Sequence, residues 1–195
     1  MIKESTSEKR PTRAPDPRPA RTRAAILNAV ERLGSRGDEL SVSGVVAEAG
    51  LSRSSFYSQF KDLGDIAVQL VRDVDSRLAD DAGSVSEPAE AILAQARALL
   101  DEFQQRRHLY AAVLGADNPI GGQWEVSSIM AEGIRRNLEG ATPADIDAEF
   151  ASRYIASGYL ASIADWLSSE NPGPVDKLEV QLRDMLPNWV TTTQK

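Results

Sequence analysis

The sequence predicts an all-α protein, and three observations support this prediction. Apolar side chains recur three and four positions apart along most of the 195 residues, which is the spacing of a buried helix face. No segment shows the period of two that a half-buried strand requires. Glycine, proline and capping residues fall between the apolar stripes, where helices begin and end. With 42% apolar residues, the chain can bury the core of one large domain or two small ones.

Residues 1–20 differ from the rest of the chain because they are rich in proline and poor in apolar side chains. This composition predicts a disordered arm. Its cations are Lys3, Lys9, Arg10, Arg13 and Arg18, diluted by Glu4, Glu8 and Asp16. A first helix is expected from Arg21, with the apolar stripe Ile26, Leu27, Val30 and Leu33. Gly34 and Gly37 are expected to break this helix.

Two short helices joined by a tight turn are predicted between Ser41 and Lys61. Ser41 is a suitable N-cap, Gly50 suits the left-handed residue that ends a helix, and Ser52 can cap the second helix. The inward positions are Val42, Val45, Val46, Leu51, Phe56 and Phe60. The outward positions are Ser52, Arg53, Ser54, Ser55, Tyr57 and Gln59. A helix with this outer face can enter the major groove and donate to phosphates and base edges, so the pattern predicts a helix-turn-helix.

Beyond residue 61 every apolar stripe has helical spacing. Asp62 can cap a long helix that Gly83 and Ser84 end, Pro88 opens the next, and Thr142-Pro143 is a typical helix start. The stripes are Ile66, Leu70, Val74 and Leu78; Ile92, Leu99 and Phe103; Leu109, Tyr110, Val113 and Leu114 before Gly115; and Trp124, Met130, Ile134 and Leu138.

The last two predicted helices carry features that favour helix pairing. One face of the first is mostly small-sided, through Tyr154, Ser157, Gly158, Ala161, Ser162 and Asp165, which lets another helix approach closely. The second repeats Val175, Leu178, Leu182, Met185 and Trp189 at alternating intervals of three and four, a seam that requires a partner helix. Pro187 is expected to end or kink this helix near its C-terminus.

The segments RTRAAILNAV and SVSGVVAEAGLSRSSFYSQFKDLGDIA together resemble the N-terminal DNA-binding domain of TetR-type (TetR/AcrR) transcriptional regulators, over roughly Arg21 to Leu70. The resemblance implies a three-helix helix-turn-helix DNA-binding domain followed by a larger helical ligand-binding and dimerisation domain. We therefore expect a basic arm at 1–20, a DNA-binding domain at 21–66 and an effector-binding and dimerisation domain at 67–195. The family usually has a lysine at the start of the fourth helix. Here that position is Leu63, and Lys61 is the nearest cation.

The predicted DNA contacts lie on the helix-turn-helix and the helix before it. Ser41 and Ser43 are expected to anchor phosphate at a helix N-terminus, and the guanidinium of Arg53 matches guanine O6 and N7. Tyr57 is either a backbone contact, which we favour, or a half-buried core residue. The full set is Arg21, Ser41, Ser43, Ser52, Arg53, Ser54, Ser55, Tyr57, Gln59 and Lys61.

Charge is distributed unevenly, although the net charge of −7 is acidic. Residues 1–61 hold eleven Lys and Arg against seven Asp and Glu, whereas residues 62–195 hold eleven against twenty-two. A basic N-terminal end on an acidic body places the field that attracts DNA where the motif lies. The basic arm either wraps the duplex or is a solvated leader, and the sequence favours neither.

The resemblance also implies that the last two helices pair with their copies in a second subunit; the alternative is packing within one subunit. The predicted dimer residues are Tyr154, Ser157, Gly158, Ala161, Asp165, Leu178, Leu182, Met185 and Trp189. It implies a small-molecule effector enclosed by the middle helices, for which aromatic and methionine side chains suit an apolar or aromatic compound. The candidate lining residues are Phe103, Tyr110, Leu114, Trp124, Met130 and Trp166, each of which has ordinary core packing as its alternative. Gly121-Gly122 is either a pocket gate or a turn.

The expected function is that of a dimeric repressor released from a palindromic operator by an effector. An architectural or effector-independent DNA-binding protein is the alternative, but it would not need a large acidic helical body. A helical enzyme ranks third, because His108 is the only histidine and no phosphate loop, paired metal ligands or nucleophile elbow occurs. The sequence has no cysteine, signal peptide or apolar membrane span, so we expect a cytoplasmic protein without cofactor or metal.

Overall fold

The computed structural model describes residues 16–81, 88–115, 122–139 and 142–191. In these ranges the regular elements are helices and no strand occurs, so the all-α prediction is confirmed. The predicted ends at Gly83 and Ser84, most of the arm and Gly121 lie outside the described residues.

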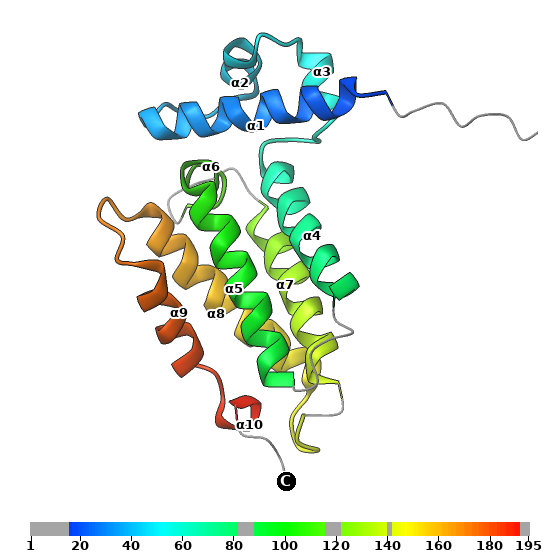
Figure 1. Ribbon diagram of the computed structural model, residues 1–195, viewed down its shortest axis with the longest axis vertical. Coiled ribbons are helices and arrows are strands. Elements are labelled where there is room, and N and C mark those ends of the chain that lie inside the picture. Colours follow the sequence, from blue (N-terminus) through cyan, green and yellow to red (C-terminus); the bar gives the residue numbers. More distant parts are fainter. Residues whose placement is uncertain (1–15, 82–87, 116–121, 140–141, 192–195) are drawn as a thin grey trace, which may run out of the picture.

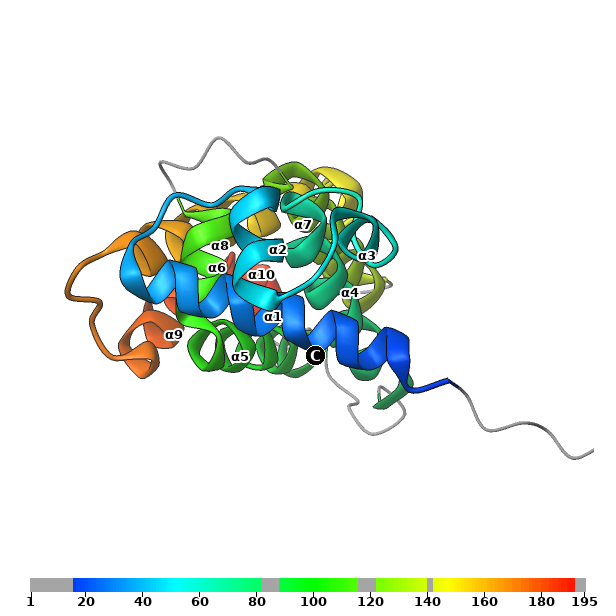
Figure 2. The same cartoon turned by 90° about the horizontal axis from the view of Figure 1, so that it is seen from above.

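Three helices form one end of the molecule, which we call the head (Figure 1). They are α1 (Arg18–Arg36), α2 (Val42–Ala49) and α3 (Arg53–Tyr57). Helix α1 lies across this end, and α2 and α3 cover its outer side (Figure 2). Residues 18–20, which the sequence assigned to the arm, form the first turn of α1, with Pro19 near its start.

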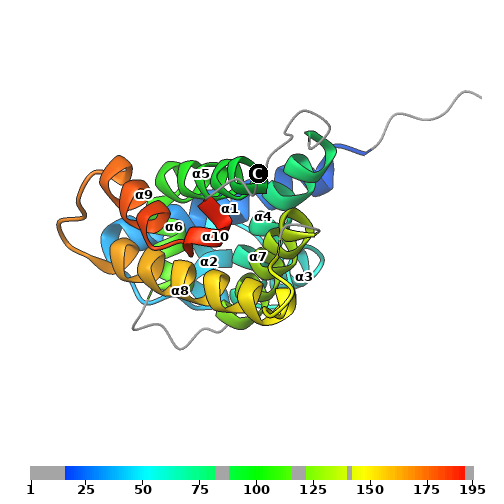
Figure 3. The same cartoon turned by 90° about the horizontal axis from the view of Figure 1, so that it is seen from below.

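The remaining helices form the body. Helices α4 (Gly64–Asp81), α5 (Pro88–Gln105), α6 (Arg107–Leu114) and α7 (Gln123–Leu138) are followed by α8 (Ala148–Ser168), α9 (Val175–Asp184) and α10 (Asn188–Thr191). Seen from the end opposite the head, α5 and α8 lie on opposite sides, with α4 and α7 together on a third (Figure 3). The predicted domain boundary between residues 66 and 67 falls inside the first turn of α4.

Local capping sets several helix ends as the sequence predicted. The Asp62 carboxylate accepts a hydrogen bond of 2.8 Å from the Asp65 N–H at the start of α4. Pro88 opens α5, and Gly115 follows the end of α6. Pro187 lies after α9, which ends at Asp184. In each case the signal acts within one turn of the chain, so tertiary packing does not override it.

Two predicted helix ends are wrong. Gly34 lies inside α1 and does not end it; a Cβ at this position would lie 2.5 Å from the carbonyl oxygen of His108, so the glycine allows α1 to cross α6 closely. Gly37, with a φ of 70°, is the residue that ends α1. Thr142-Pro143 does not open α8. That helix begins at Ala148, and the Asp147 carboxylate accepts from the N–H groups of Glu149 and Phe150.

Candidate nucleic-acid interface

The outer helices of the head are held by aromatic packing beneath them. Phe56 and Phe60 are almost fully buried, with ring centres 5.9 Å apart. Their burial fixes the inner side of α3, so the opposite side must face solvent. The predicted inward positions of this segment are therefore confirmed, and Leu51 is partly buried beside the same core.

Serine side chains cap both helices of the motif. The Ser41 hydroxyl accepts a hydrogen bond of 3.0 Å from the Gly44 N–H, and the Ser52 hydroxyl accepts one of 3.1 Å from the Ser55 N–H. Between the helices Gly50 has a φ of 65°, the left-handed conformation that the turn requires. The hydroxyl of Ser52 also lies 2.8 Å from those of Ser54 and Ser55. The start of α3 thus presents a group of hydroxyls whose hydrogens can be redirected toward an acceptor.

Arg53 joins the two helices of the motif. Its guanidinium donates a hydrogen bond of 2.6 Å from Nη2 to the hydroxyl of Ser43 on α2. Both residues are exposed, and no ion pair in the described part of the chain involves Arg53. The predicted base reader and a predicted phosphate anchor are therefore neighbours, and the guanidinium retains donors that no carboxylate occupies.

The other predicted contacts surround this pair. Tyr57 is 56% exposed, with its ring edge-on to Phe56, so it is not the half-buried core residue of the alternative prediction. Gln59 is partly buried, whereas Arg21 and Lys61 are exposed. Leu63, where the family usually has lysine, is buried in the core. This leaves Lys61 as the exposed cation at this edge.

Several arginines of the head are neutralised by carboxylates. Arg32 and Arg36 both pair with Glu48, at 2.6 and 2.9 Å, and Arg36 also pairs with Asp38. Hydrogen bonds from Arg32 and Arg36 hold the pKa of the Glu48 carboxyl below its usual value. Arg23 pairs with Asp73 of α4. Of the head residues that the structure describes, the cations outside any ion pair are Arg21, Arg53 and Lys61, all of which the sequence analysis selected.

The predicted effector residues are not arranged around one open space. Phe103, Tyr110, Leu114 and Met130 are fully buried, and the rings of Phe103 and Tyr110 meet edge to face with centres 4.5 Å apart. Burial, followed by the charge of Glu102, raises the pKa of the Tyr110 hydroxyl. The Trp124 side chain is 71% exposed, so in this conformation it does not line an enclosed space. Trp166 lies apart from these residues and donates its indole N–H to the Gly173 carbonyl at 2.8 Å.

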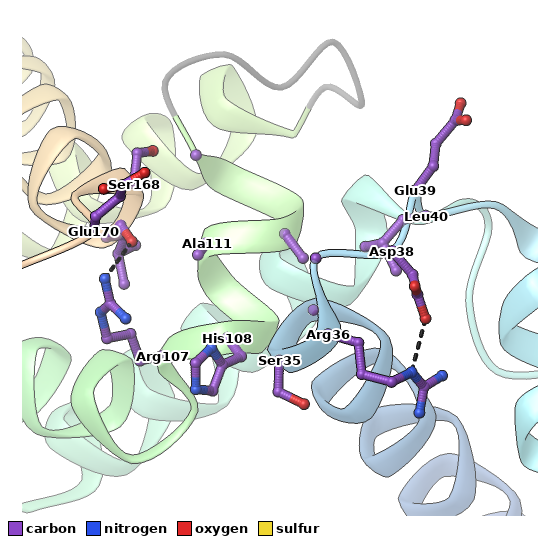
Figure 4. A pocket seen from close by; sticks show the side chains of 15 residues that line it. Ser35, Arg36, Asp38, Glu39, Leu40, Arg107, His108, Ala111, Ser168 and Glu170 are labelled. Carbon is purple, nitrogen blue, oxygen red and sulfur yellow. Dashed lines mark hydrogen bonds and ion pairs between the residues drawn. The ribbon is translucent and has the colours of Figure 1, made fainter.

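A groove of about 930 Å³ lies elsewhere, between the head and the body (Figure 4). It is lined by the end of α1 and the following loop, by α6, and by the end of α8. Arg107 donates to the carbonyl oxygens of Leu167 and Ser169, and so caps the C-terminus of α8 beside the groove. His108, exposed on the same side, has no carboxylate partner among the described residues. Pattern analysis of the sequence missed this groove, because its walls come from three distant segments.

The body presents one exposed face with the predicted small side chains. Ser157, Gly158, Ala161 and Asp165 are exposed on α8, and Tyr154 is 68% exposed beside them. The predicted seam on α9 behaves differently. Leu178 and Leu182 are buried within the subunit, and the Tyr159 hydroxyl donates to the Leu182 carbonyl at 2.7 Å. Met185 is 79% exposed and Trp189 is partly buried.

Other classes of site find no support in the described residues. There, no group of three or more His, Asp or Glu side chains is placed to hold a metal ion. No helix in the same ranges is long and apolar enough to cross a membrane.

Gly122 has a φ of 92°, and a Cβ there would lie 2.9 Å from the Gly64 carbonyl oxygen, so it brings the start of α7 close to the start of α4.

Comparison of the sequence with protein-family models gives no match, and comparison with curated proteins gives none either. Solved structures do match. A TetR transcriptional regulator from Streptococcus agalactiae is 23% identical with a TM-score of 0.55, covering 87% of this chain and 95% of its own. FadR from Thermus thermophilus, a TetR-family repressor solved with lauroyl-CoA, is 18% identical with a TM-score of 0.62, covering 89% and 97%. RolR, solved with resorcinol, is 19% identical with a TM-score of 0.56, covering 87% and 89%. The chain therefore has a TetR-type fold.

Proposed function

We propose that this protein is a DNA-binding transcriptional regulator that docks α3 into the major groove of double-stranded DNA. The observation that carries the proposal is the outer face of the motif, where Arg53 and Lys61 are outside ion pairs while other head arginines are neutralised. The exposed hydroxyls at the start of α3 add donors for phosphate. The TetR-type fold supports the proposal, because solved structures that share it are regulators by name.

The experiment is selection of bound duplexes from a random pool by the full-length protein. We expect enrichment of a palindromic sequence, because a two-fold protein reads two half-sites. Recovery of sequences with no common motif would contradict sequence-specific regulation and favour the architectural alternative. Failure to retain any duplex at low salt would contradict DNA binding altogether.

We further propose a homodimer formed through the exposed face of α8. Gly158 lies at the centre of this face, and a Cβ there would meet nothing within 4 Å. A large side chain at this position therefore fits the isolated subunit but would separate two helices packed closely together. The proposed interface does not include Leu178 and Leu182 of α9, because both side chains are buried in the core of the subunit. Tyr154 and the exposed Met185 remain candidates for the edge of the interface.

Gly158→Arg tests the dimer, with Gly173→Arg as the matched control, since a Cβ at Gly173 is equally unobstructed. We expect sedimentation of the Gly158 variant as a monomer with the wild-type helical content, and a dimer for the control. Operator affinity should fall together with dimerisation. A Gly158 variant that remains a dimer would place the interface elsewhere.

We propose that an effector lowers operator affinity, as a repressor function requires. The support is analogy of fold: two neighbours that share it, FadR and RolR, were solved in complex with lauroyl-CoA and with resorcinol. In this conformation Phe103, Tyr110, Leu114 and Met130 are close-packed, so a ligand there would require the helices to separate. Repeating the duplex selection with apolar and aromatic compounds tests this proposal. If no compound changes operator affinity, the effector-independent alternative holds.

A further inference from the structure

The segment that follows α3 is hydrogen-bonded to a side chain of α4. Gln69, half-buried on α4, donates from Nε2 to the carbonyl oxygen of Gln59 at 3.0 Å. The same amide nitrogen donates to Oδ2 of Asp65 at 2.7 Å. That carboxylate oxygen also accepts from the Lys61 N–H at 2.9 Å. Two side chains of α4, Gln69 and Asp65, therefore hold the backbone of residues 59–61 by one hydrogen bond each.

The other end of the same amide is occupied by α1. Arg23 donates from Nη1 to Oε1 of Gln69 and from Nη2 to Oδ2 of Asp73, the latter at 3.0 Å. Its guanidinium carbon lies 5.0 Å from the centre of the Phe60 ring. Arg23 is thus turned toward α4 and Phe60 and is committed to contacts inside the protein. We call Arg23, Gln69 and Asp65 the clamp.

The clamp acts where the motif has little support of its own. Helix α3 has only five residues, too few for a stable isolated helix. Its inner side is fixed by Phe56 and Phe60, which set its depth in the head. Gln59 lies two residues beyond the end of α3 and leads to Lys61, and the hydrogen bonds that join this stretch to α4 side chains are those of the clamp. A segment that is hydrogen-bonded to α4 and also contacts Arg23 of α1 can tilt less than one held only by the packing of Phe56 and Phe60.

We propose that Gln69 and Arg23 are positioning residues for DNA recognition: they set the angle of α3 and the place of Lys61 without touching DNA. The inference rests on the proposed function, since it assumes that α3 reads the duplex. It goes beyond the predicted contact set, which contains neither residue. Loss of the clamp leaves the DNA-contacting side chains present but misaligned. Specific binding, which needs base-edge geometry, must then suffer more than phosphate binding, which tolerates small displacements.

Gln69→Met is the main test, because methionine keeps the length and neutrality of the side chain and removes both hydrogen-bonding ends. We expect the ratio of selected to random duplex affinity to fall about tenfold, as for loss of one or two hydrogen bonds. The slope of affinity against salt should stay at the wild-type value, since no phosphate contact is removed. A merely structural role would lower affinity for all duplexes together with the melting temperature.

Two further variants separate the parts of the clamp. Gln69→Glu keeps an acceptor for Arg23 but loses the donor to Gln59, so it should be as defective in specificity as Gln69→Met. Arg23→Met should show the same loss of specificity, whereas Arg72→Met on α4 should not. Arg72 is exposed and in no ion pair of the described chain, which makes it a matched loss of one positive charge. Should Gln69→Met fail to fold, Gln69→Glu provides the decision.

The outcomes distinguish this inference from the proposed function. If the wild-type protein selects an operator and a folded Gln69 variant keeps the wild-type affinity ratio, the clamp proposal is overturned. If the wild-type protein selects no sequence, the proposed function fails and a second measurement decides about the clamp. Amide hydrogen exchange across residues 58–65 should then be faster in Gln69→Met than in wild type, and unchanged exchange would overturn the clamp.

Discussion

The head and the body of this molecule use their charged side chains differently. In the body, exposed arginines such as Arg97 and Arg136 lie against carboxylates of neighbouring helices. In the head, Arg23, Arg32 and Arg36 pair with carboxylates, while the outer face carries Arg53 and Lys61 outside such pairs. The acidic net charge of the chain therefore does not describe residues 1–61, which hold more Lys and Arg than Asp and Glu.

The two regions also differ in how much core supports them. The head buries apolar side chains from three helices, with Phe56 and Phe60 as the buried rings under the motif, whereas the body buries them from seven described helices. We expect Phe56→Ala to destabilise the head by about 3–5 kcal/mol, the usual cost of removing a buried phenylalanine. Thermal denaturation followed by circular dichroism should then show the head melting before the body. Tyr57→Ala, which removes an exposed ring, is the control. A single unchanged transition for Phe56→Ala would show that the two regions do not differ in this way.

Gly34 tests the contact between the regions. In a helix interior, alanine is more favourable than glycine by about 1 kcal/mol. At position 34, however, the Cβ of alanine would lie 2.5 Å from the His108 carbonyl oxygen. We therefore expect Gly34→Ala to destabilise the protein by about 1–3 kcal/mol, as for overpacking. Gly44→Ala is the comparison, because its Cβ would press on one side chain, the Ser41 hydroxyl at 3.3 Å, and not on the backbone of another helix. Equal melting temperatures for the two variants would mean that the head moves away from α6 at little cost.

The outer face of the head should separate base reading from phosphate binding. Arg53→Ala should relax sequence preference at one position of the operator by about 1–3 kcal/mol, as for loss of a bidentate guanine contact. Lys61→Ala should weaken binding to all duplexes and reduce the salt slope by about one unit. Competition binding at several salt concentrations measures both effects. An unchanged preferred sequence for Arg53→Ala would contradict its assignment as a base reader.

The smallest expected effect concerns the ion pairs of the head. The pKa of Glu48 is lowered by its hydrogen bonds to Arg32 and Arg36, so the carboxylate stabilises the folded state above its unfolded pKa. That contribution disappears as the pH falls through the lowered pKa of the folded state. Glu48→Gln should accordingly reduce the melting temperature slightly at pH 7, and by progressively less as the pH is lowered below the unfolded pKa of the carboxyl. Because Arg36 is exposed and Glu48 is partly exposed, added salt should shrink the difference at pH 7. A difference that does not shrink as the pH falls would have another cause.

The sequence by itself determined the features whose causes are local. The helical periodicity, the serine caps at Ser41 and Ser52 and the left-handed turn at Gly50 each depend on residues within a few positions of one another. The same local reasoning identified the face of α3 that points outward, because two buried phenylalanines fix the other side. The distribution of charge between the head and the body is also written in the sequence.

The tertiary structure decided which apolar or small residues face which neighbour. Gly34 and Leu182 have sequence patterns that fit a helix break and a dimer seam, yet one lies at the crossing with α6 and the other is buried within the subunit. Arg23 and Gln69 look like ordinary surface residues until α1 and α4 bring them into contact with the end of α3. Periodicity states that a helix has a buried face, but not what covers it. That partner is chosen by packing between segments far apart in the chain, which no local pattern encodes.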